Sequence, residues 1–441
     1  MDRLIISGGN TLSGCVPISG AKNAALPCLA APLLASGEVT LDHLPAVADI
    51  RTMIKVLQAL GCDVTTNRAK DVFELSAIVK TDNLENSKLE APYELVKTMR
   101  ASILVLGPLL ARFGRASVSL PGGCAIGARP VNLHLDALQR MGAKINIDGG
   151  YIVASVPGGR LTGIDHTFDK VSVGATENLM MAACLAKGVT VLRNAAVEPE
   201  IGDLARMLRT MGAKIDGIGA PVLTIIGSDS LGGCRHAVIP DRIEAGTFIC
   251  ALAVAGGDIV LERVEPDDLK PLTDLMAIIG CGIEETDKSD EQDGAVKKLR
   301  VFKNPETRLK SRDVITAPHP GFPTDLQAQV MAVMTQAAGI SIIKETIFEN
   351  RFQHAMELER LGANLRVEGN TAIVAGPSQL TGCTVMATDL RASAALVIAG
   401  LAAKGDVTID RIYHLDRGYA GIERKLQAIG AGVKRVKGGR V

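Results

Sequence analysis

One pattern occurs six times along the chain, and this repeat limits the folds that the sequence can adopt. In each copy an apolar helical stretch ends at a glycine, which is followed by a small residue and a strand-like run. A glycine just past a helix supplies the left-handed backbone that closes it, and the alternation that follows is typical of a strand. The six glycines lie 81, 70, 68, 82 and 68 residues apart and are Gly61, Gly142, Gly212, Gly280, Gly362 and Gly430.

Upstream of each glycine lies a second helical stretch, rich in small residues and apolar on nearly every side. It too is followed by a glycine and a strand, as in ENLMMAACLAKGVTVL. A helix that is apolar all round is buried, and repeated units need neighbours to cover their apolar faces. We therefore expect an α/β fold in which helices form the inside and sheets cover them.

The distribution of the copies predicts two similar domains in this chain of 441 residues, which is too long for one core. The first domain is expected over residues 21–238 and the second over residues 239–441. Residues 1–20 are expected to pair as strands with the C-terminal half, and a cleft between the domains is expected to enclose the substrate. The polar, lysine-rich segment Asp287–Lys310 is expected to be an exposed hairpin or loop.

The charge balance and the cysteine and histidine spacings exclude several classes of function. Lys plus Arg and Asp plus Glu number 48 each, which argues against a nucleic acid or a membrane surface as the main partner. The nine cysteines form no CxxC pair, and no signal peptide is evident, so we expect free thiols in a cytoplasmic protein. The histidines form no HxH or HExxH pattern, so no metal and no cofactor are predicted. A monomer is expected.

In a repetitive scaffold, chemistry is expected where one copy departs from the pattern. The second copy carries the loop LPGGCAIGARP, which contains Gly122, Gly123, Cys124, Arg129 and Pro130. The glycines let backbone approach a ligand closely, and a thiol beside an arginine is biased toward thiolate. The local pattern fits a reactive cysteine over an anionic substrate and an ordinary turn with a spectator cysteine equally well.

Cations gather at the junctions of the copies although the protein is neutral. Arginine forks bind phosphates and carboxylates in bidentate fashion, and a helix N-terminus, where Lys22 and Asn23 are expected, favours an anion. This set of cations therefore suits a substrate with several phosphates and a carboxylate. At any single position there is an alternative: the cation is a solvated lysine, or it is present because the repeat places the same residue in each copy. The six cations are Lys22, Arg100, Arg129, Arg351, Arg391 and Arg417.

Two further residues have two interpretations each. Asp325 follows Thr324 at an expected helix start, where it is either an N-cap or first-turn acid worth about 1 kcal/mol or a general base. His134 lies close after Arg129 and either touches the ligand or packs between helices.

Ten stretches in order resemble the UDP-N-acetylglucosamine 1-carboxyvinyltransferase family, the enolpyruvyl transferases of early peptidoglycan synthesis. The resemblance implies two inside-out α/β barrel domains, each of three βαβαββ-like units with buried helices. It also implies transfer of the enolpyruvyl group of phosphoenolpyruvate to the 3′-hydroxyl of UDP-N-acetylglucosamine, through a tetrahedral ketal and with release of phosphate. The stretches are SGAKNAAL, PYELVKTMRAS, LPGGCAIGARPVNLH, DKVSVGAT, NAAVEPEI, PDRIEAGTF, TAPHPGFPTDLQAQ, IFENRF, MATDLRASAALV and IYHLDRGY.

The resemblance also implies roles for single residues. Cys124 would protonate the methylene carbon and can form a thio-adduct, Asp325 would take the proton of the 3′-hydroxyl, and Lys22 and Arg417 would also be catalytic. The residues expected at the phosphate of phosphoenolpyruvate are Lys22, Asn23, Arg129 and Arg417, and those at its carboxylate are Arg351 and Arg391. The residues expected at the nucleotide sugar are Arg100, Arg129, Pro130, Val131, Asn132, Leu133, Lys170, Val171, Ser172, Val173, Asp325 and Ile347.

The chain departs from the family at Asn132, where many relatives have Asp, and in the long polar segment Asp287–Lys310. Because Cys124 is present, the resemblance implies sensitivity to fosfomycin-type alkylation. Three alternatives stay open: an inactive paralogue that binds UDP-sugar, a shikimate 3-phosphate enolpyruvyl transferase, and a purely structural repeat protein. The second would lack the cysteine loop and the APHPGFPTD stretch, and the third would not need cations at the junctions.

Overall fold

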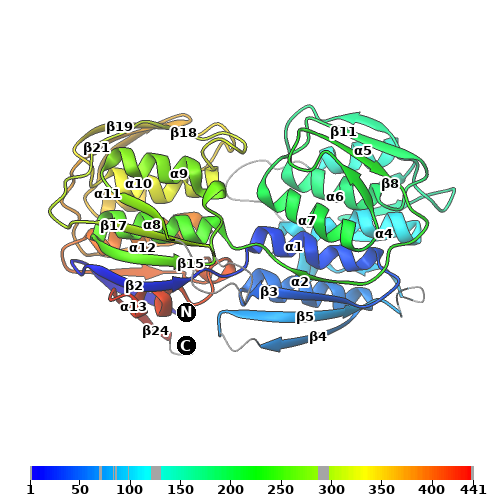
Figure 1. Cartoon of the computed structure of the whole chain (residues 1–441), viewed down its shortest axis with the longest axis horizontal. Coiled ribbons are helices and arrows are strands. Elements are labelled where there is room, and N and C mark those ends of the chain that lie inside the picture. Colours follow the sequence, from blue (N-terminus) through cyan, green and yellow to red (C-terminus); the bar gives the residue numbers. More distant parts are fainter. Residues whose placement is uncertain are drawn as a thin grey trace. The chain divides into compact units, whose positions relative to one another are not determined.

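The computed structural model describes residues 2–68, 72–82, 84, 87–97, 99–120, 131–286 and 297–438. Within these ranges the chain divides into two units (Figure 1). Unit 1 contains residues 2–19, 240–286 and 297–438, and unit 2 contains the described residues from 20 to 239. No helix in these ranges is long and apolar enough to cross a membrane.

The described part of each unit contains three four-stranded sheets with one shared topology. In every sheet one edge strand is parallel to its neighbour and the other pairings are antiparallel. The sheets of unit 2 have the strand orders β14(Cys234–Ala237)-β3(Val39–Pro45)-β5(Glu74–Lys80)-β4(Asp63–Arg68), β6(Glu90–Ala91)-β7(Arg115–Ser119)-β9(Tyr151–Ser155)-β8(Lys144–Asp148) and β10(Asp165–Thr167)-β11(Val189–Arg193)-β13(Val222–Ile226)-β12(Lys214–Asp216). Those of unit 1 have the orders β16(Gly282–Thr286)-β17(Lys298–Lys303)-β15(Gly257–Glu262)-β2(Leu12–Pro17), β18(Val314–Ile315)-β19(Gly339–Lys344)-β21(Thr371–Gly376)-β20(Asn364–Glu368) and β22(Thr384–Met386)-β23(Asp406–Asp410)-β1(Arg3–Ser7)-β24(Gly432–Val436).

The parallel edge strand links each copy of the repeat to the next. In unit 2 the strands β6 and β10 each leave one copy for the sheet of the following copy, and β14 returns from the third copy to the sheet of the first. In unit 1 the ring closes through the N-terminal segment, because β1 joins the sheet of the sixth copy and β2 joins that of the fourth. The sixth copy is thus split between the two ends of the chain, and the expected pairing of residues 1–20 with the C-terminal half is confirmed.

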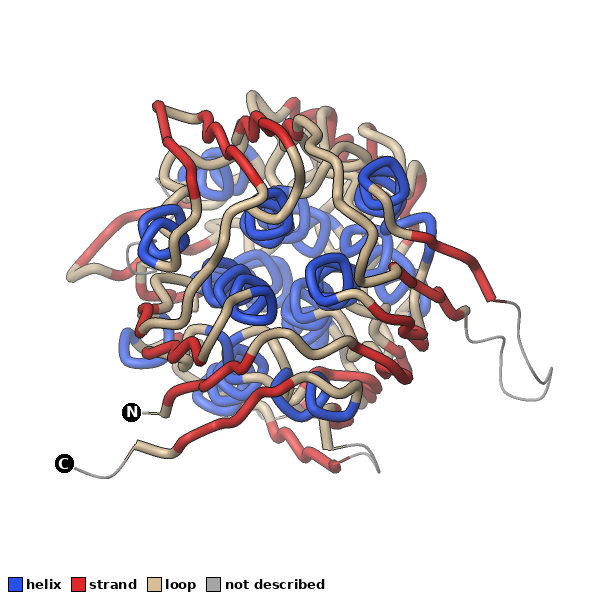
Figure 2. The backbone as a smooth tube through the Cα atoms, turned by 90° about the vertical axis from the view of Figure 1, so that its left-hand side faces the viewer, coloured by secondary structure: helices blue, strands red, loops and turns tan. Residues whose placement is uncertain are grey.

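In each unit three helices form the interior, as predicted for helices that are apolar on every side. The interior helices of unit 1 pack directly on one another, and the whole of α10 is buried. Figure 2 shows the backbone with unit 1 toward the viewer. Helices lie at the centre and strands lie around them. The interior helices are α1 (Lys22–Ala30), α4 (Leu106–Phe113) and α6 (Val173–Ala183) in unit 2, and α8 (Arg242–Ala255), α10 (Gln327–Met334) and α12 (Leu390–Ala402) in unit 1.

A second helix of each copy is amphipathic and lies farther out. These helices are α2 (Ala48–Leu60), α5 (Asn132–Arg140), α7 (Pro199–Thr210), α9 (Pro266–Ile279), α11 (Ala355–Arg360) and α13 (Ile422–Ala428). The six repeat glycines follow them with φ between +94° and +122°, a conformation that residues with a Cβ rarely adopt. The glycine-closed helices predicted from the repeat are therefore confirmed.

The expectation for the segment Asp287–Lys310 is partly wrong. Residues 287–296 lie outside the described residues, but Lys298–Lys303 forms β17, which pairs with both β15 and β16. Leu299 and Val301 are buried beneath this sheet. The alternation of KLRVFK is a strand pattern that the high lysine content of the segment obscures.

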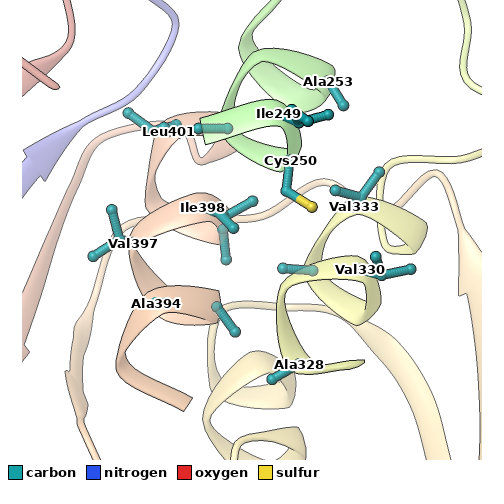
Figure 3. Packing of buried hydrophobic residues seen from close by; sticks show 14 of the residues in the cluster. Ile249, Cys250, Ala253, Ala328, Val330, Val333, Ala394, Val397, Ile398 and Leu401 are labelled. Atoms are coloured by element: carbon teal, nitrogen blue, oxygen red, sulfur yellow. The ribbon is translucent and has the colours of Figure 1, made fainter. Parts of the chain in front are cut away.

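Glycines let the interior helices approach their neighbours closely. A Cβ at Gly246 of α8 would lie 2.7 Å from a methyl carbon of Leu326, and one at Gly400 of α12 would lie 3.2 Å from Ile6. Figure 3 shows the contact of α8, α10 and α12, where Cys250 points toward Val333. Such packing has no room for added atoms, and this explains the high content of small residues.

Gly107 of α4 provides a test of this packing. In a Gly107→Ala variant the new Cβ would lie 2.2 Å from Oδ1 of Asn178 in α6 and 2.4 Å from its carbonyl oxygen. It would also disturb the hydrogen bond of 2.7 Å from the Gly107 N–H to that Oδ1. We expect a loss of about 2–3 kcal/mol in the free energy of unfolding, measured with urea. Gly158→Ala is the control, because nothing lies within 4 Å of a Cβ there; equal effects of the two variants would contradict the packing argument.

Candidate functional site

Asp325 of unit 1 joins two buried arginines. It lies in a short 3-10 helix, η4 (Thr324–Leu326), directly before α10. Its Oδ1 accepts a hydrogen bond from Arg351 at 2.7 Å and its Oδ2 one from Arg391 at 2.6 Å. The arginine side chains are only 3% and 7% exposed, whereas that of Asp325 is 24% exposed. Asp325 is the acidic residue in the first turn of η4, and its carboxylate pairs with both arginines.

Arg391 owes its position to the start of α12. The side chain of Asp389 caps this helix by accepting the N–H groups of Arg391 and Ala392 at 2.8 and 3.0 Å. Burial alone would lower the pKa of Arg391, but Asp325 and Tyr419 beside it raise this pKa above the ordinary value. The guanidinium therefore stays charged although it is buried.

Neutral polar groups that the sequence did not point to form hydrogen bonds with both Asp325 and Arg391. The hydroxyl of Tyr419 lies 2.8 Å from that of Thr247 and accepts from Arg391 at 3.3 Å. The amide of Gln329 donates to the backbone oxygen of Asp325 at 2.9 Å. Burial raises the pKa of Tyr419, so the phenol stays protonated. Gln329 and Tyr419 were detectable only as polar residues inside the stretches TAPHPGFPTDLQAQ and IYHLDRGY.

Glu345 fixes the loops around Asp325. This buried carboxylate accepts hydrogen bonds from the hydroxyls of Thr316 and Thr324 at 2.9 and 2.8 Å. It also accepts the backbone N–H of Ile347 at 2.8 Å. Glu345 therefore holds the residue before Asp325 and the turn that carries Ile347, a predicted nucleotide-sugar residue.

Arg417 and the predicted cations of unit 2 also lie at element ends. Arg417 ends the 3-10 helix η5 (Leu415–Arg417), and Lys22 and Asn23 begin α1. The Nζ of Lys22 lies 3.4 Å from a carboxylate oxygen of Asp49. Arg100 begins η3 (Arg100–Val105), which leads directly into α4. The structure thus confirms the helix start expected at Lys22 and Asn23, and it places Arg100 and Arg417 in 3-10 turns that precede or follow other elements.

The predicted nucleotide-sugar residues of unit 2 that the structure describes lie at the starts of two neighbouring helices. Val131, Asn132 and Leu133 begin α5, and the run Lys170–Val173 leads into α6. Ser172 caps α6 by accepting the N–H of Ala175 at 3.3 Å. The two helix starts meet where the His134 ring lies against Gly174. Cys124, Arg129 and Pro130 lie outside the described residues.

His134 packs between helices, the second of its two interpretations. The amide nitrogen of Asn178 donates to its Nδ1 at 3.0 Å and to the carbonyl oxygen of Ile103 at 3.0 Å. The Oδ1 of Asn178 accepts the N–H of Gly107. Burial, with a smaller contribution from nearby Arg100, lowers the pKa of His134 to about 4. The ring is therefore neutral near pH 7 and carries its proton on Nε2.

Each unit thus brings together some of the residues that the sequence predicts for the substrate sites. Unit 1 joins Asp325, Arg351 and Arg391 through direct bonds, which leave one net positive charge on the three groups. Such a group can accept a further carboxylate or phosphate, because that anion can compete for guanidinium N–H donors now bound to Asp325. Unit 2 gathers the starts of α5 and α6 close to His134, within the electrostatic reach of Arg100.

Comparison with known proteins assigns the chain to a family. Residues 6–426 match the family described as EPSP synthase (3-phosphoshikimate 1-carboxyvinyltransferase). The chain is 53% identical to a UDP-N-acetylglucosamine 1-carboxyvinyltransferase of Rhodospirillum centenum over 445 residues, covering 99% of both chains. It is 51% identical to a protein of the same name from Magnetococcus marinus over 436 residues, covering 99% of this chain and 100% of the relative.

The chain belongs to the UDP-N-acetylglucosamine 1-carboxyvinyltransferase family. The fold agrees with this assignment, because the crystal structure of the enolpyruvyl transferase NikO from Streptomyces tendae superposes with a TM-score of 0.84. That protein is 26% identical, and the match covers 98% of each chain. The family resemblance and the α/β fold class predicted from the sequence are both confirmed.

The buried His134 makes stability depend on pH in this member of the 1-carboxyvinyltransferase family. Its pKa rises from about 4 in the folded chain to its ordinary value of about 6.5 on unfolding, so only the unfolded state gains a proton between these values. Stability is therefore full above about pH 6.5 and falls as the pH drops toward 4, by about 3 kcal/mol. In a His134→Gln variant, which cannot titrate, urea unfolding should show a smaller loss between pH 7 and 4. Identical losses in both proteins would contradict the assigned protonation state.

The pairing of Asp325 is a second stability test. Asp325→Ala leaves two buried guanidinium groups without their carboxylate, and we expect a loss of about 2–4 kcal/mol in the free energy of unfolding. Asp229→Ala is a matched control, since Asp229 contacts Arg160 at the same distance of 2.7 Å but is 96% exposed. We expect little effect from the control, because exposed pairs contribute little. Thermal unfolding in which both variants behave alike would overturn the role of burial.

Proposed function

We propose that the chain transfers the enolpyruvyl group of phosphoenolpyruvate to the 3′-hydroxyl of UDP-N-acetylglucosamine, with release of phosphate. The observation that carries this proposal is the carboxylate of Asp325, held between two buried and charged arginines in a chain of this family. This arrangement offers a base and an anion site at one place. The reaction would be the first committed step of peptidoglycan synthesis, and we propose that it takes place in the cytoplasm.

The geometry supports a coupling between substrate binding and base strength. Arg351 and Arg391 are proposed to bind the carboxylate of phosphoenolpyruvate, and both now donate to Asp325. An arriving carboxylate would compete for these donors, and a carboxylate that loses hydrogen bonds becomes a stronger base. Asp325 would then take the proton of the 3′-hydroxyl as this oxygen attacks C2 of phosphoenolpyruvate.

The other half of the addition is a proton transfer to carbon. We propose Cys124 as the acid that protonates the methylene carbon, which generates the cation-like centre that the hydroxyl attacks. The resulting tetrahedral ketal then loses phosphate from C2 and a proton from its methyl group, which the Cys124 thiolate takes back, as the enol double bond re-forms. The residues proposed at the leaving phosphate are Lys22, Asn23, Arg129 and Arg417, of which Lys22 and Arg417 also act in catalysis.

The nucleotide sugar is proposed to bind residues at helix starts, where backbone N–H groups and the helix dipole favour a diphosphate. The proposed set is Arg100, Arg129, Pro130, Val131, Asn132, Leu133, Lys170, Val171, Ser172, Val173, Asp325 and Ile347. Since this set draws on both units, we propose that residues 21–238 and residues 1–20 with 239–441 act as two domains on the same pair of substrates. We further propose a monomer that needs no cofactor or metal for this reaction.

Phosphate release from phosphoenolpyruvate tests the proposal. We expect release by the wild-type chain only with UDP-N-acetylglucosamine, and a fall of about 10²–10⁴-fold in Cys124→Ser and in Asp325→Asn, because each removes a proton-transfer group. Asp229→Asn, which changes an exposed carboxylate, is the control and should keep full activity.

Four outcomes would overturn parts of this assignment. Release driven by shikimate 3-phosphate would transfer the chain to the other enolpyruvyl transferase. Tight binding of UDP-N-acetylglucosamine without release would leave an inactive paralogue. Full release by Cys124→Ser would remove the acid role, and full activity after fosfomycin treatment would remove the proposed reactivity of this thiol.

A further inference from the structure

Three side chains that can bind a metal meet inside unit 2, and none of them is among the residues proposed for catalysis. Cys28 lies on α1, Asp203 on α7 and His236 on β14. The Sγ of Cys28 lies 3.8 Å from one carboxylate oxygen of Asp203, and the Nε2 of His236 lies 3.1 Å from the other. One ligand atom from each residue falls within 4.8 Å of the other two.

We propose that Cys28, Asp203 and His236 form a binding site for a divalent transition-metal ion, with Zn²⁺ as the ion that the donor set fits best. Zn²⁺ takes thiolate, imidazole and carboxylate ligands at about 2.0–2.3 Å in a tetrahedron. Ligand atoms around such an ion are about 3.3–3.8 Å apart. The separations of 3.8 Å between Cys28 and Asp203 and of 3.1 Å between His236 and Asp203 are close to these values, and the ligand atoms of Cys28 and His236 lie within 4.8 Å of one another, so side-chain movements would complete the site.

The position of the cluster protects it from solvent and leaves one access route. Cys28 is fully buried and Asp203 is 1% exposed, whereas the side chain of His236 is 12% exposed. An ion would therefore enter past His236. Arg206 lies 3.7 Å from Asp203 on the solvent side, with more than half of its side chain exposed, so it can turn away when a metal ion takes its place.

Acidic groups gather around the cluster. Glu177 is buried close to Cys28, and Glu200 is a neighbour of Glu177. In the metal-free chain the Cys28 thiol donates to Asp203. A divalent ion would offset this accumulation of acidic groups.

The binding step balances in protons and charge. Cys28 releases its thiol proton to solvent and binds as thiolate, and Asp203 binds through a carboxylate oxygen. The Nε2–H of His236 donates to Asp203 in the metal-free chain, so His236 must give up this proton and carry its ring proton on Nδ1 for Nε2 to bind the ion. The two positive charges of the ion then equal the two negative charges of the thiolate and the carboxylate.

Cys234 offers a fourth ligand. It precedes His236 by two residues in β14, so the two side chains leave the strand on the same side, and both are partly buried while their neighbours are exposed. Cys234 also contributes electrostatically to the raised pKa of Cys28, as a nearby thiol does. A water molecule or this thiol would complete the tetrahedron.

Spacing along the sequence does not predict this site, because its three ligands come from elements far apart in the chain. Cys28 and Asp203 are 175 residues apart, and Asp203 and His236 are 33 apart. An ion here would join α1, α7 and β14. Since Lys22 begins the same helix six residues before Cys28, the ion would also fix the helix that carries a proposed catalytic lysine.

Cobalt substitution tests the proposal in the full-length, reduced chain. After treatment with a chelator, added Co²⁺ should give a thiolate-to-cobalt absorption band and the visible spectrum of a tetrahedral site, with one ion per chain. Added Zn²⁺ should remove both signals by displacement and should raise the thermal unfolding temperature. A spectrum without a thiolate band, or no binding, would overturn the proposal.

Variants identify the ligands. Cys28→Ser and His236→Gln should each weaken Zn²⁺ binding by about 100-fold or more in calorimetric titration. Cys184→Ser is the matched control, because Cys184 is equally buried in unit 2 but donates only to the carbonyl oxygen of Met180. If Cys28→Ser unfolds, the partly exposed His236→Gln carries the test, after circular dichroism has shown that it is folded. Unchanged affinity in a folded His236→Gln would overturn the site, and so would loss of affinity only in Cys124→Ser.

Discussion

Contact between helices that are apolar on every side is the constraint on which each unit depends. Such helices cannot face water, so sheets must surround them, and glycines at positions such as Gly107, Gly246 and Gly400 set how closely they approach. The sheets in turn need closure, which the parallel edge strands provide by joining each copy to the next. The repeat, the small residues and the ring of sheets are therefore consequences of one packing requirement.

The burial of the interior helices also limits where charged and polar residues can lie. The middle of an interior helix has no room for charge, but its first turn presents backbone N–H groups that need partners. Lys22 begins α1, Arg100 begins the 3-10 turn before α4, and Ser172 caps α6. Asp325 precedes α10 and Arg391 lies in the first turn of α12. Polar residues thus collect at the N-terminal ends of the interior helices, where nearby Asp325 helps to keep the buried Arg391 charged.

Much of this arrangement follows from the sequence, and the part that does not has a physical reason. The repeat glycines and the all-apolar stretches predict the helices, because one local conformation and one burial pattern allow few alternatives. The pairing of Asp325 with Arg351 and Arg391 and the support from Tyr419 depend on contacts between distant segments, which local patterns do not encode. At Lys298–Lys303 the strand period is present in the sequence, but the high lysine content of the segment led to the wrong expectation of an exposed loop.

The split of the sixth copy between the two ends of the chain has a consequence for synthesis on the ribosome. The strands β1 and β2 emerge first, yet β1 pairs with β23 and β24, whose last residue is Val436. At roughly 5–20 residues per second, β1 waits on the order of 20–90 s for its partners. During that time the whole of unit 2 emerges and can complete its own three sheets. The strand β1, with Leu4 and Ile6 still uncovered, is thus exposed to aggregation or chaperone binding for most of the synthesis of the chain.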